Sequence, residues 1–174
     1  MMRVREVPKE KRERLKKGNL FIPKIFSYGA TIEGIDLETY SNNPTKISKA
    51  LKEIHRFFRV DGVFCCDRLS NFEDSSQVNL LIDIIKRINI MIPELPVACE
   101  LYKPFSQEVD SSDLINIIET LGSAGLDIVI FRDELPTENS LNLSSIANVA
   151  NFFELNPMII IDNFEPEKHK DVIE

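Results

Sequence analysis

Short hydrophobic runs alternate with longer amphipathic segments along the whole chain. The clearest runs are residues 61–67 and 127–133, each of which opens with an aspartate and closes with another six residues later. Residues 21–28, 97–102 and 158–162 are further runs of similar length. Runs of this kind are typical of strands that are buried on both faces of a parallel sheet. The pattern therefore predicts five strands.

The segments between these runs carry hydrophobic residues at helical spacing. We expect one helix over residues 44–59, with Asn43 as its cap, and others that start at Ser75 or Ser76, at Ser112 and at Ile146. A charged helix over residues 9–17 should end at Gly18 and has too few hydrophobic residues to belong to the core. We interpret residues 1–20 as a charged helix and linker that precede the main fold.

The order of the elements predicts a single α/β domain over residues 1–174. The connections are too long for hairpins, so the strands should pair in parallel through right-handed crossovers. Two architectures fit. One is a flavodoxin-like open sheet of five strands. The other is a partial or shortened (β/α)₈ barrel, because a complete barrel needs about 250 residues.

Composition excludes several classes of protein. The net charge of −7 and the pI near 5.0 argue against a nucleic-acid surface, which requires clustered cations. We expect no membrane span and no signal peptide, and hence a cytoplasmic protein. The three cysteines should be reduced and buried. Cys65 and Cys66 are neighbours in a predicted strand, so their side chains should point to opposite faces.

Charged residues follow several of the predicted strands, and the carboxyl ends of parallel strands meet at one edge. Arginine and lysine there can hold an anionic ligand, while Asp67 and Asp133 are candidate general bases or ligands for Mg²⁺. The same charged residues can instead form ion pairs or cap helices. The ligand-binding candidates beside the two aspartates are Tyr28, Arg68, Glu100, Lys103, Arg132 and Asp162.

Residues 11–18 (Lys-Arg-Glu-Arg-Leu-Lys-Lys-Gly), followed by Ile22-Pro23, resemble the opening of the uroporphyrinogen decarboxylase superfamily. The similarity continues through residues 34–40, Asn43-Pro44 and residues 59–64. Residues 101–106 (Leu-Tyr-Lys-Pro-Phe-Ser) and Gly125-Leu126-Asp127 resemble a later turn and a later strand of that family. The chain is more similar to the branch of cobamide-dependent methyltransferases that act on coenzyme M. The resemblance implies a (β/α)₈ barrel with its site at the strand C-termini, and Asp67 matches the aspartate that contacts the tetrapyrrole in the decarboxylases.

The chain also departs from this family. Residues 27–30 (Ser-Tyr-Gly-Ala) stand where the decarboxylases carry arginines, and the His-x-Cys pair with which the methyltransferases bind zinc is missing. His55 and His169 have no evident cysteine partner, so we expect no zinc ligand set. The sequence does not determine a cofactor, and Mg²⁺ is one candidate.

Two functions therefore fit. The first is a lyase or methyltransferase that takes a small anionic, methylated or tetrapyrrole-type ligand. The second is a non-catalytic binding or assembly partner, with a corrinoid protein as a candidate partner. An unclosed barrel would leave hydrophobic surface and strand edges exposed, so we expect a homo-oligomer.

Overall fold

A parallel sheet lies at the centre of the computed structural model, which describes residues 7–70, 74–102, 104, 111–134, 151 and 155–162. The strands are β1 (Val63–Phe64), β2 (Val97–Tyr102), β3 (Ile128–Glu134) and β4 (Asn156–Asp162). They pair in the order β1-β2-β3-β4, all in parallel. The expected α/β fold with parallel strands is confirmed. Within the described residues β1 and β4 form two edges, so the sheet is open.

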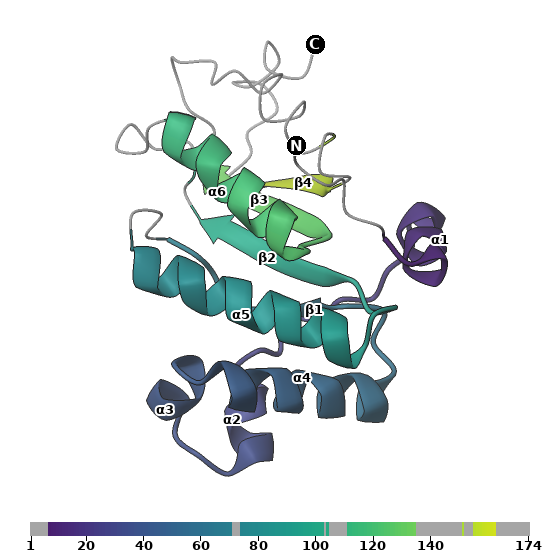
Figure 1. Ribbon diagram of the computed structural model, residues 1–174, viewed down its shortest axis with the longest axis vertical. Coiled ribbons are helices and arrows are strands. Elements are labelled where there is room, and N and C mark those ends of the chain that lie inside the picture. Colours follow the sequence, from purple (N-terminus) through teal and green to yellow (C-terminus); the bar gives the residue numbers. More distant parts are fainter. Residues whose placement is uncertain are drawn as a thin grey trace.

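Helices cover one face of this sheet. Figure 1 shows α5 (Ser75–Met91) and α6 (Ser111–Ala124) along the strands, with α4 (Pro44–Phe58) packed beside α5 on the side away from α6. The short helices α2 (Tyr28–Glu33) and α3 (Leu37–Ser41) pack beside α4. The main hydrophobic core lies between the sheet and these helices.

Caps set the helix boundaries. The side chain of Asn43 accepts a hydrogen bond from the Lys46 amide at 3.1 Å, so α4 starts where the sequence predicts. Helix α5 is capped by Asp74, not by Ser75 or Ser76, and the Asp74 carboxylate accepts from the Ser76 amide at 2.9 Å. The described part of the chain contains no helix long and hydrophobic enough to cross a membrane.

The predicted strand over residues 21–28 is wrong. Pro23 has no amide to donate, and its carbonyl accepts from the Ile25 amide at 3.0 Å, which bends the chain. Phe26 and Ser27 form a turn, and Tyr28 begins α2. Before the bend, the Asp61 amide donates to the Phe21 carbonyl and the Phe21 amide donates to the Asp61 carboxylate, both at 2.9 Å. These two hydrogen bonds therefore hold Phe21 next to Asp61, just before β1.

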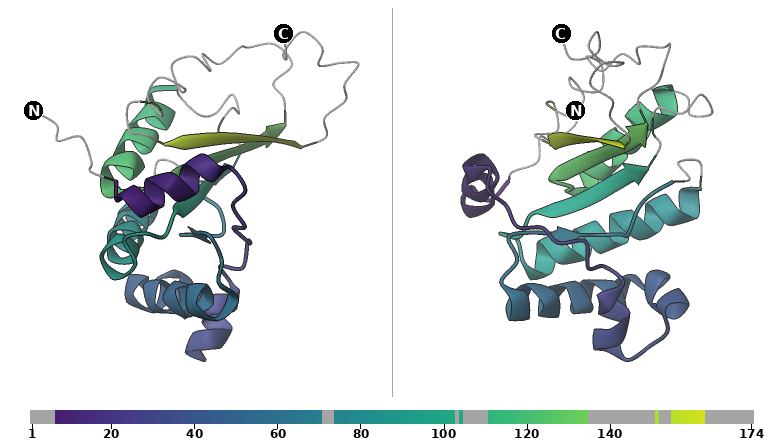
Figure 2. Two further views of the ribbon diagram at one scale, coloured as in Figure 1. Left: turned by 90° about the vertical axis from the view of Figure 1, so that its right-hand side faces the viewer. Right: turned by 180° about the vertical axis from the view of Figure 1, so that it is seen from behind.

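With Phe21 bound to Asp61, residues 19–24 cross the sheet face opposite to α5 and α6, as the right-hand view of Figure 2 shows. Leu15, Leu20 and Ile22 pack there against a second hydrophobic cluster formed by Phe64, Ala98, Ile128 and Ile130. Gly62 permits this approach, because a Cβ there would lie 2.9 Å from both the Ile22 side chain and the Pro96 carbonyl.

The predicted strand over residues 61–67 is shorter than expected. Regular pairing stops at Phe64, residues 65–67 bend, and Leu69 returns to form an isolated bridge with Leu101. The predicted helix over residues 146–153 falls almost wholly outside the described residues.

Helix α1 (Lys9–Lys17) ends at Gly18, as predicted, with a left-handed φ of 72°. It lies at the N-terminal ends of the strands (Figures 1 and 2). The expectation that this helix does not belong to the core is wrong for Lys11, and Leu15 packs against the second hydrophobic cluster. Lys11 is fully buried because it pairs with Asp127.

Candidate ligand-binding site

A cavity of about 360 Å³ opens near the C-terminal ends of β2 and β3. Its lining carries three cations and two carboxylates, so it holds one excess positive charge in a chain whose net charge is −7. Tyr102 supplies the aromatic part of the wall. The lining residues are Lys24, Asp67, Arg68, Glu100, Tyr102 and Arg132.

Glu100 is the buried centre of this site. Its side chain is only 2% exposed, and both carboxylate oxygens accept from the Lys24 ammonium at 3.0 Å. Arg132 approaches from β3, with Nη1 4.0 Å from Glu100 Oε2. A buried carboxylate needs partners of this kind, because an unpaired buried charge is costly. The side chains of Lys24 and Arg132 are each about one-third exposed, so both cations reach the cavity.

Strand register explains why these groups meet. In β2, Glu100 and Tyr102 are two residues apart and share one face of the sheet, and Arg132 of β3 is paired in register with Tyr102. Lys24 comes from the segment that crosses the same face. The site is therefore built on the side of the sheet opposite to α5 and α6.

Arg68 is the exposed cation of the cavity. Its guanidinium carbon lies 4.9 Å from the centre of the Tyr102 ring, which is within the range of a cation–π contact. Within the described part of the chain no carboxylate lies within ion-pair distance of Arg68. Asp67 is also exposed and lines the same cavity.

Four of the eight predicted site residues thus come together, namely Asp67, Arg68, Glu100 and Arg132. Tyr28 does not belong to the site. Because residues 21–28 form no strand, Tyr28 begins α2, and its ring packs edge-on against Phe58 at 6.2 Å.

The remaining predicted residues cannot be placed as side chains. Lys103 lies outside the described residues. Asp133 and Asp162 are placed by their backbones alone, in β3 and at the end of β4, where they pair with Ile161 and Glu134.

Sequence reasoning missed Lys24 and Tyr102. Lys24 was assigned to the interior of a strand that does not form, and no local pattern links it to Glu100, 76 residues later. Tyr102 could have been found, because it follows Glu100 by two residues in a correctly predicted strand and so shares its face.

The three cysteines form a second cluster. Their sulfur atoms all lie within 4.8 Å of one another, and Cys66 Sγ is 3.6 Å from Cys99 Sγ. They are free thiols, as expected. Hydrogen bonds with the other two thiols lower the pKa of Cys66 well below its usual value. Hydrogen bonds within the cluster, together with burial, raise the pKa of Cys65 and of Cys99.

This cluster corrects one argument made from the sequence. Cys65 and Cys66 do not point to opposite faces, because the strand ends at Phe64 and the chain bends between them. The expectation of no zinc ligand set rests on the missing His-x-Cys pair and stays a prediction. The three thiols are a different group that could hold a metal ion.

No protein-family model matches this chain, and a search of the curated proteins finds no match. The resemblance to the uroporphyrinogen decarboxylase superfamily is thus untested by comparison, and the site must be interpreted from its own chemistry.

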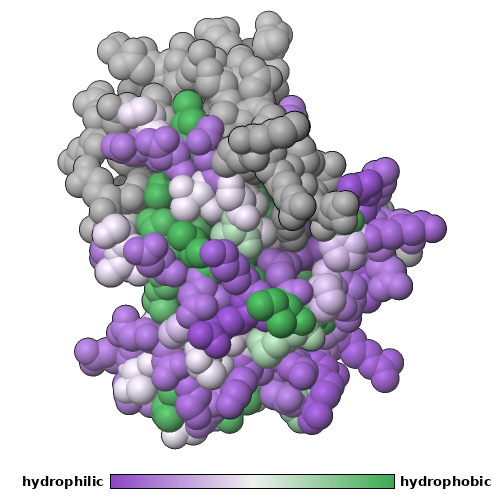
Figure 3. All heavy atoms as spheres, viewed as in Figure 1, coloured by the Kyte–Doolittle hydropathy of each residue, from purple (hydrophilic) through white to green (hydrophobic). Residues whose placement is uncertain are grey.

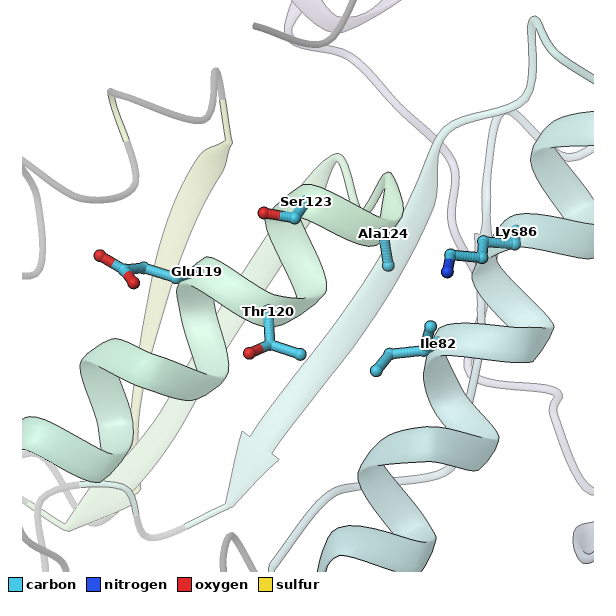
Figure 4. Close-up of a pocket in the computed structure, with 6 residues that line it drawn as sticks. All are labelled: Ile82, Lys86, Glu119, Thr120, Ser123 and Ala124. Atoms are coloured by element: carbon cyan, nitrogen blue, oxygen red, sulfur yellow. The ribbon is translucent and has the colours of Figure 1, made fainter. Parts of the chain in front are cut away.

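A further hollow of about 360 Å³ lies between α5 and α6. Figure 4 shows Lys86 and Ile82 on one side and Thr120 and Ala124 on the other, with Glu119 extending away from Lys86. None of its lining residues is a buried charge. It therefore lacks the paired and buried groups that mark the cavity around Glu100.

Proposed function

We propose that the protein binds a small anionic molecule in the cavity around Glu100, with Arg68 as the principal contact. The observation that carries this proposal is the guanidinium of Arg68, which is exposed to the cavity, in cation–π contact with Tyr102 and not paired with any described carboxylate. The planar guanidinium is suited to carboxylate, sulfonate or phosphate, because it can donate two parallel hydrogen bonds.

The pairs around Glu100 support this assignment. Lys24 is held by hydrogen bonds to the buried carboxylate, and Arg132 lies 4.0 Å from it; each presents about a third of its side chain to solvent. They can therefore add hydrogen bonds to an anion that Arg68 binds first. Asp67 would set selectivity by repelling a second negative charge or by accepting a hydrogen bond from a ligand hydroxyl or thiol.

The size of the cavity favours a small ligand. Sites for small molecules span roughly 300–1,000 Å³, and this cavity of about 360 Å³ lies at the lower end of that range. A complete tetrapyrrole would extend beyond it. A compact sulfonate or carboxylate that carries a thiol or methyl group fits this volume better.

The proposal is compatible with a shortened (β/α)₈ barrel of the uroporphyrinogen decarboxylase type, which we retain as the proposed family. Its support is the strand order, which follows the sequence with no reversal, and the position of α5 and α6 on one face. A flavodoxin-like sheet reverses its strand order at a switch point. In a barrel, the face that carries Glu100 would be the interior, where ligands bind beside the strand C-termini.

Calorimetric titration with coenzyme M, a small sulfonate thiol, and with simple dicarboxylates tests the proposal. Losing a charged hydrogen bond is worth about 1.5–3 kcal/mol, so Arg68→Gln should weaken binding by about tenfold or more. Glu100→Gln should act in the opposite direction, because it releases Lys24 and Arg132 from their counter-ion. The matched control is Arg56→Gln, which removes an exposed arginine of α4 that pairs with Glu53 and should not change affinity.

The outcome separates ligand binding from other roles. Equal affinity in wild type and Arg68→Gln, or no binding by any of these anions, would refute the site. Catalysis is tested by Asp67→Asn, which should retain binding and lose turnover if Asp67 is a general base. Binding without turnover by the wild type would instead support a non-catalytic partner, for which a corrinoid protein is the first candidate to mix with the chain.

A further inference from the structure

The three cysteines lie together because two residues of the chain between β1 and α5 form backbone hydrogen bonds with β2. The Cys65 amide donates to the Ala98 carbonyl at 2.9 Å, and the Leu69 amide donates to the Glu100 carbonyl at 2.8 Å. The chain from residue 65 to residue 69, which we call the 65–69 arch, therefore bends away from β2 and returns to it. The bend turns Cys66 back toward Cys99.

The sulfur atoms have the spacing of a metal site. In a tetrahedral site with Zn–S bonds of about 2.3 Å, two sulfur ligands lie about 3.8 Å apart. Cys66 Sγ and Cys99 Sγ are 3.6 Å apart, and all three sulfurs lie within 4.8 Å of one another. Small rotations of the side chains would bring all three to bonding distance from one ion.

Hydrophobic packing alone does not require this convergence. Buried cysteines commonly behave as small hydrophobic residues, and Cys65 and Cys99 do belong to the main core. Such residues would pack equally well with their sulfur atoms pointing toward separate neighbours. Here two segments that are 33 residues apart bring three sulfurs to one point, at the place where the 65–69 arch meets β2.

We propose that Cys65, Cys66 and Cys99 bind one Zn²⁺ ion, which joins the 65–69 arch to β2. Thiolate ligands favour Zn²⁺ and other thiophilic ions over Mg²⁺ or Ca²⁺. On binding, each sulfur releases its proton to solvent and forms a bond to the ion. Three thiolates and Zn²⁺ carry a net charge of −1, and a water molecule completes the tetrahedron on the side where Cys66 is partly exposed.

This site is separate from the anion cavity. Cys99 and Glu100 are neighbours in β2, so their side chains point to opposite faces of the sheet. Cys99 lies in the core on the helix side, whereas Glu100 lines the cavity on the other side. The two proposed sites share no ligand residue, although Asp67 and Arg68 follow Cys66 in the 65–69 arch, so Cys66→Ser tests zinc binding and Arg68→Gln tests anion binding.

The first test is zinc analysis of the full chain, purified without an affinity tag under reducing conditions and dialysed against metal-free buffer after incubation with Zn²⁺. We expect one zinc per chain and a higher unfolding temperature than that of the zinc-free protein, because an ion bound only by the folded state stabilises it. Replacement by Co²⁺ should give the sulfur-to-cobalt charge-transfer absorption of thiolate ligands.

Variants identify the ligands. Cys66→Ser changes the most exposed of the three and should lower zinc affinity at least about tenfold, since losing even an outer-shell partner costs 10–100-fold. The control is His55→Gln, because His55 is a potential ligand in α4 whose Nδ1 instead pairs with the Val60 carbonyl at 2.9 Å. This variant should bind zinc as the wild type does.

A measurement on the unmodified chain guards against variants that fail to fold. One equivalent of Zn²⁺ should protect the partly exposed Cys66 thiol from a thiol-specific reagent in the native protein, while Cys65 and Cys99 are already shielded by burial. The proposal is overturned by less than about one-tenth of an equivalent of retained zinc, by cobalt spectra without a sulfur band, or by a Cys66 thiol that reacts as fast with Zn²⁺ as without it. A Cys66–Cys99 disulfide in the protein isolated under reducing conditions would also overturn it.

Discussion

The ammonium of Lys11 lies 2.6 Å from the carboxylate of Asp127, and both side chains are buried. The same ammonium donates to the side-chain oxygen of Asn89 in α5 at 2.7 Å. Asp127 in turn accepts from the Val97 amide at the start of β2 at 2.9 Å. One pair of charges therefore connects α1 with α5 and with the starts of two strands.

Removing one member of this pair should be strongly destabilising. Lys11→Met leaves the Asp127 carboxylate buried without its counter-ion, a change that typically costs about 3–5 kcal/mol. The measurement is the free energy of unfolding from urea denaturation. Lys9→Met is the matched control, because Lys9 lies in the same helix and is highly exposed, and its contact with Glu13 at 3.9 Å should contribute little.

A double variant separates the charge effect from packing. Lys11→Met combined with Asp127→Asn removes both charges and keeps an acceptor for the Val97 amide. It should be more stable than Lys11→Met alone. Equal stability of Lys11→Met and Lys9→Met would show that the buried pair has no structural role.

The close contact between Gly29 and the Tyr40 side chain predicts a second effect on stability. Tyr40 is fully buried, and a Cβ at residue 29 would overlap its hydroxyl group. Gly29→Ala should lower the free energy of unfolding by about 1–3 kcal/mol, because a well-packed core resists added atoms. Adding Tyr40→Phe removes the hydroxyl and should restore part of the loss. A Gly29→Ala protein as stable as the wild type would contradict this packing.

The Tyr40 hydroxyl also predicts a response to alkaline pH. It is buried with no hydrogen-bond partner among the described residues. Burial, and then the nearby charge of Glu33, raise its pKa above the ordinary value of 10.0. The folded state therefore holds the proton more tightly than the unfolded state. This contribution to stability is complete below pH 10 and is lost as the pH rises above it.

Urea denaturation of wild type and Tyr40→Phe at several alkaline pH values measures this effect. The wild type should lose stability above about pH 10 more steeply than the variant. Near neutral pH the variant should be as stable or more stable, because it no longer buries an unpaired hydroxyl. Parallel pH curves for the two proteins would contradict the assignment.

Self-association stays a prediction. Strand β4 is an edge of the described sheet, and Met158 within it is 51% exposed. On the face shown in Figure 3, the described hydrophobic residues form separate patches on a largely hydrophilic surface. The β4 edge is therefore a better candidate for pairing than that face.

Sedimentation equilibrium at micromolar concentration should show a species heavier than the 20.0 kDa chain. Met158→Lys should shift it toward the monomer, since a charge on an edge strand opposes pairing. Ile90→Lys is the control, because Ile90 is 80% exposed but lies in α5. A wild-type monomer, or equal effects of the two variants, would exclude association through β4.

The sequence by itself determined the elements whose signals are local. Helix α4 was predicted from Asn43, Pro44 and a repeating hydrophobic face, and β2 and β3 from continuous hydrophobic runs. Caps, periodicity and uninterrupted hydrophobicity act over a few residues, so a single segment contains the whole signal. The placement of Glu100 and Arg132 near one sheet edge followed from the same rules, because parallel strands bring their carboxyl ends together. Asp67 and Arg68 reach this edge through the bend after Phe64, which the sequence did not predict.

Only the tertiary structure decided which residues line the cavity at that edge of the sheet and which charged side chains are buried. Residues 21–28 have the composition of a strand, yet the pairing of Phe21 with Asp61 and the bend at Pro23 make them a crossing segment that delivers Lys24 to Glu100. From the sequence, Lys11 is expected at the surface of a charged helix. Only the folded structure places Asp127 beside it and buries both side chains. These contacts join residues far apart in the chain, and their energy depends on burial and charge pairing that exist only once the sheet has formed.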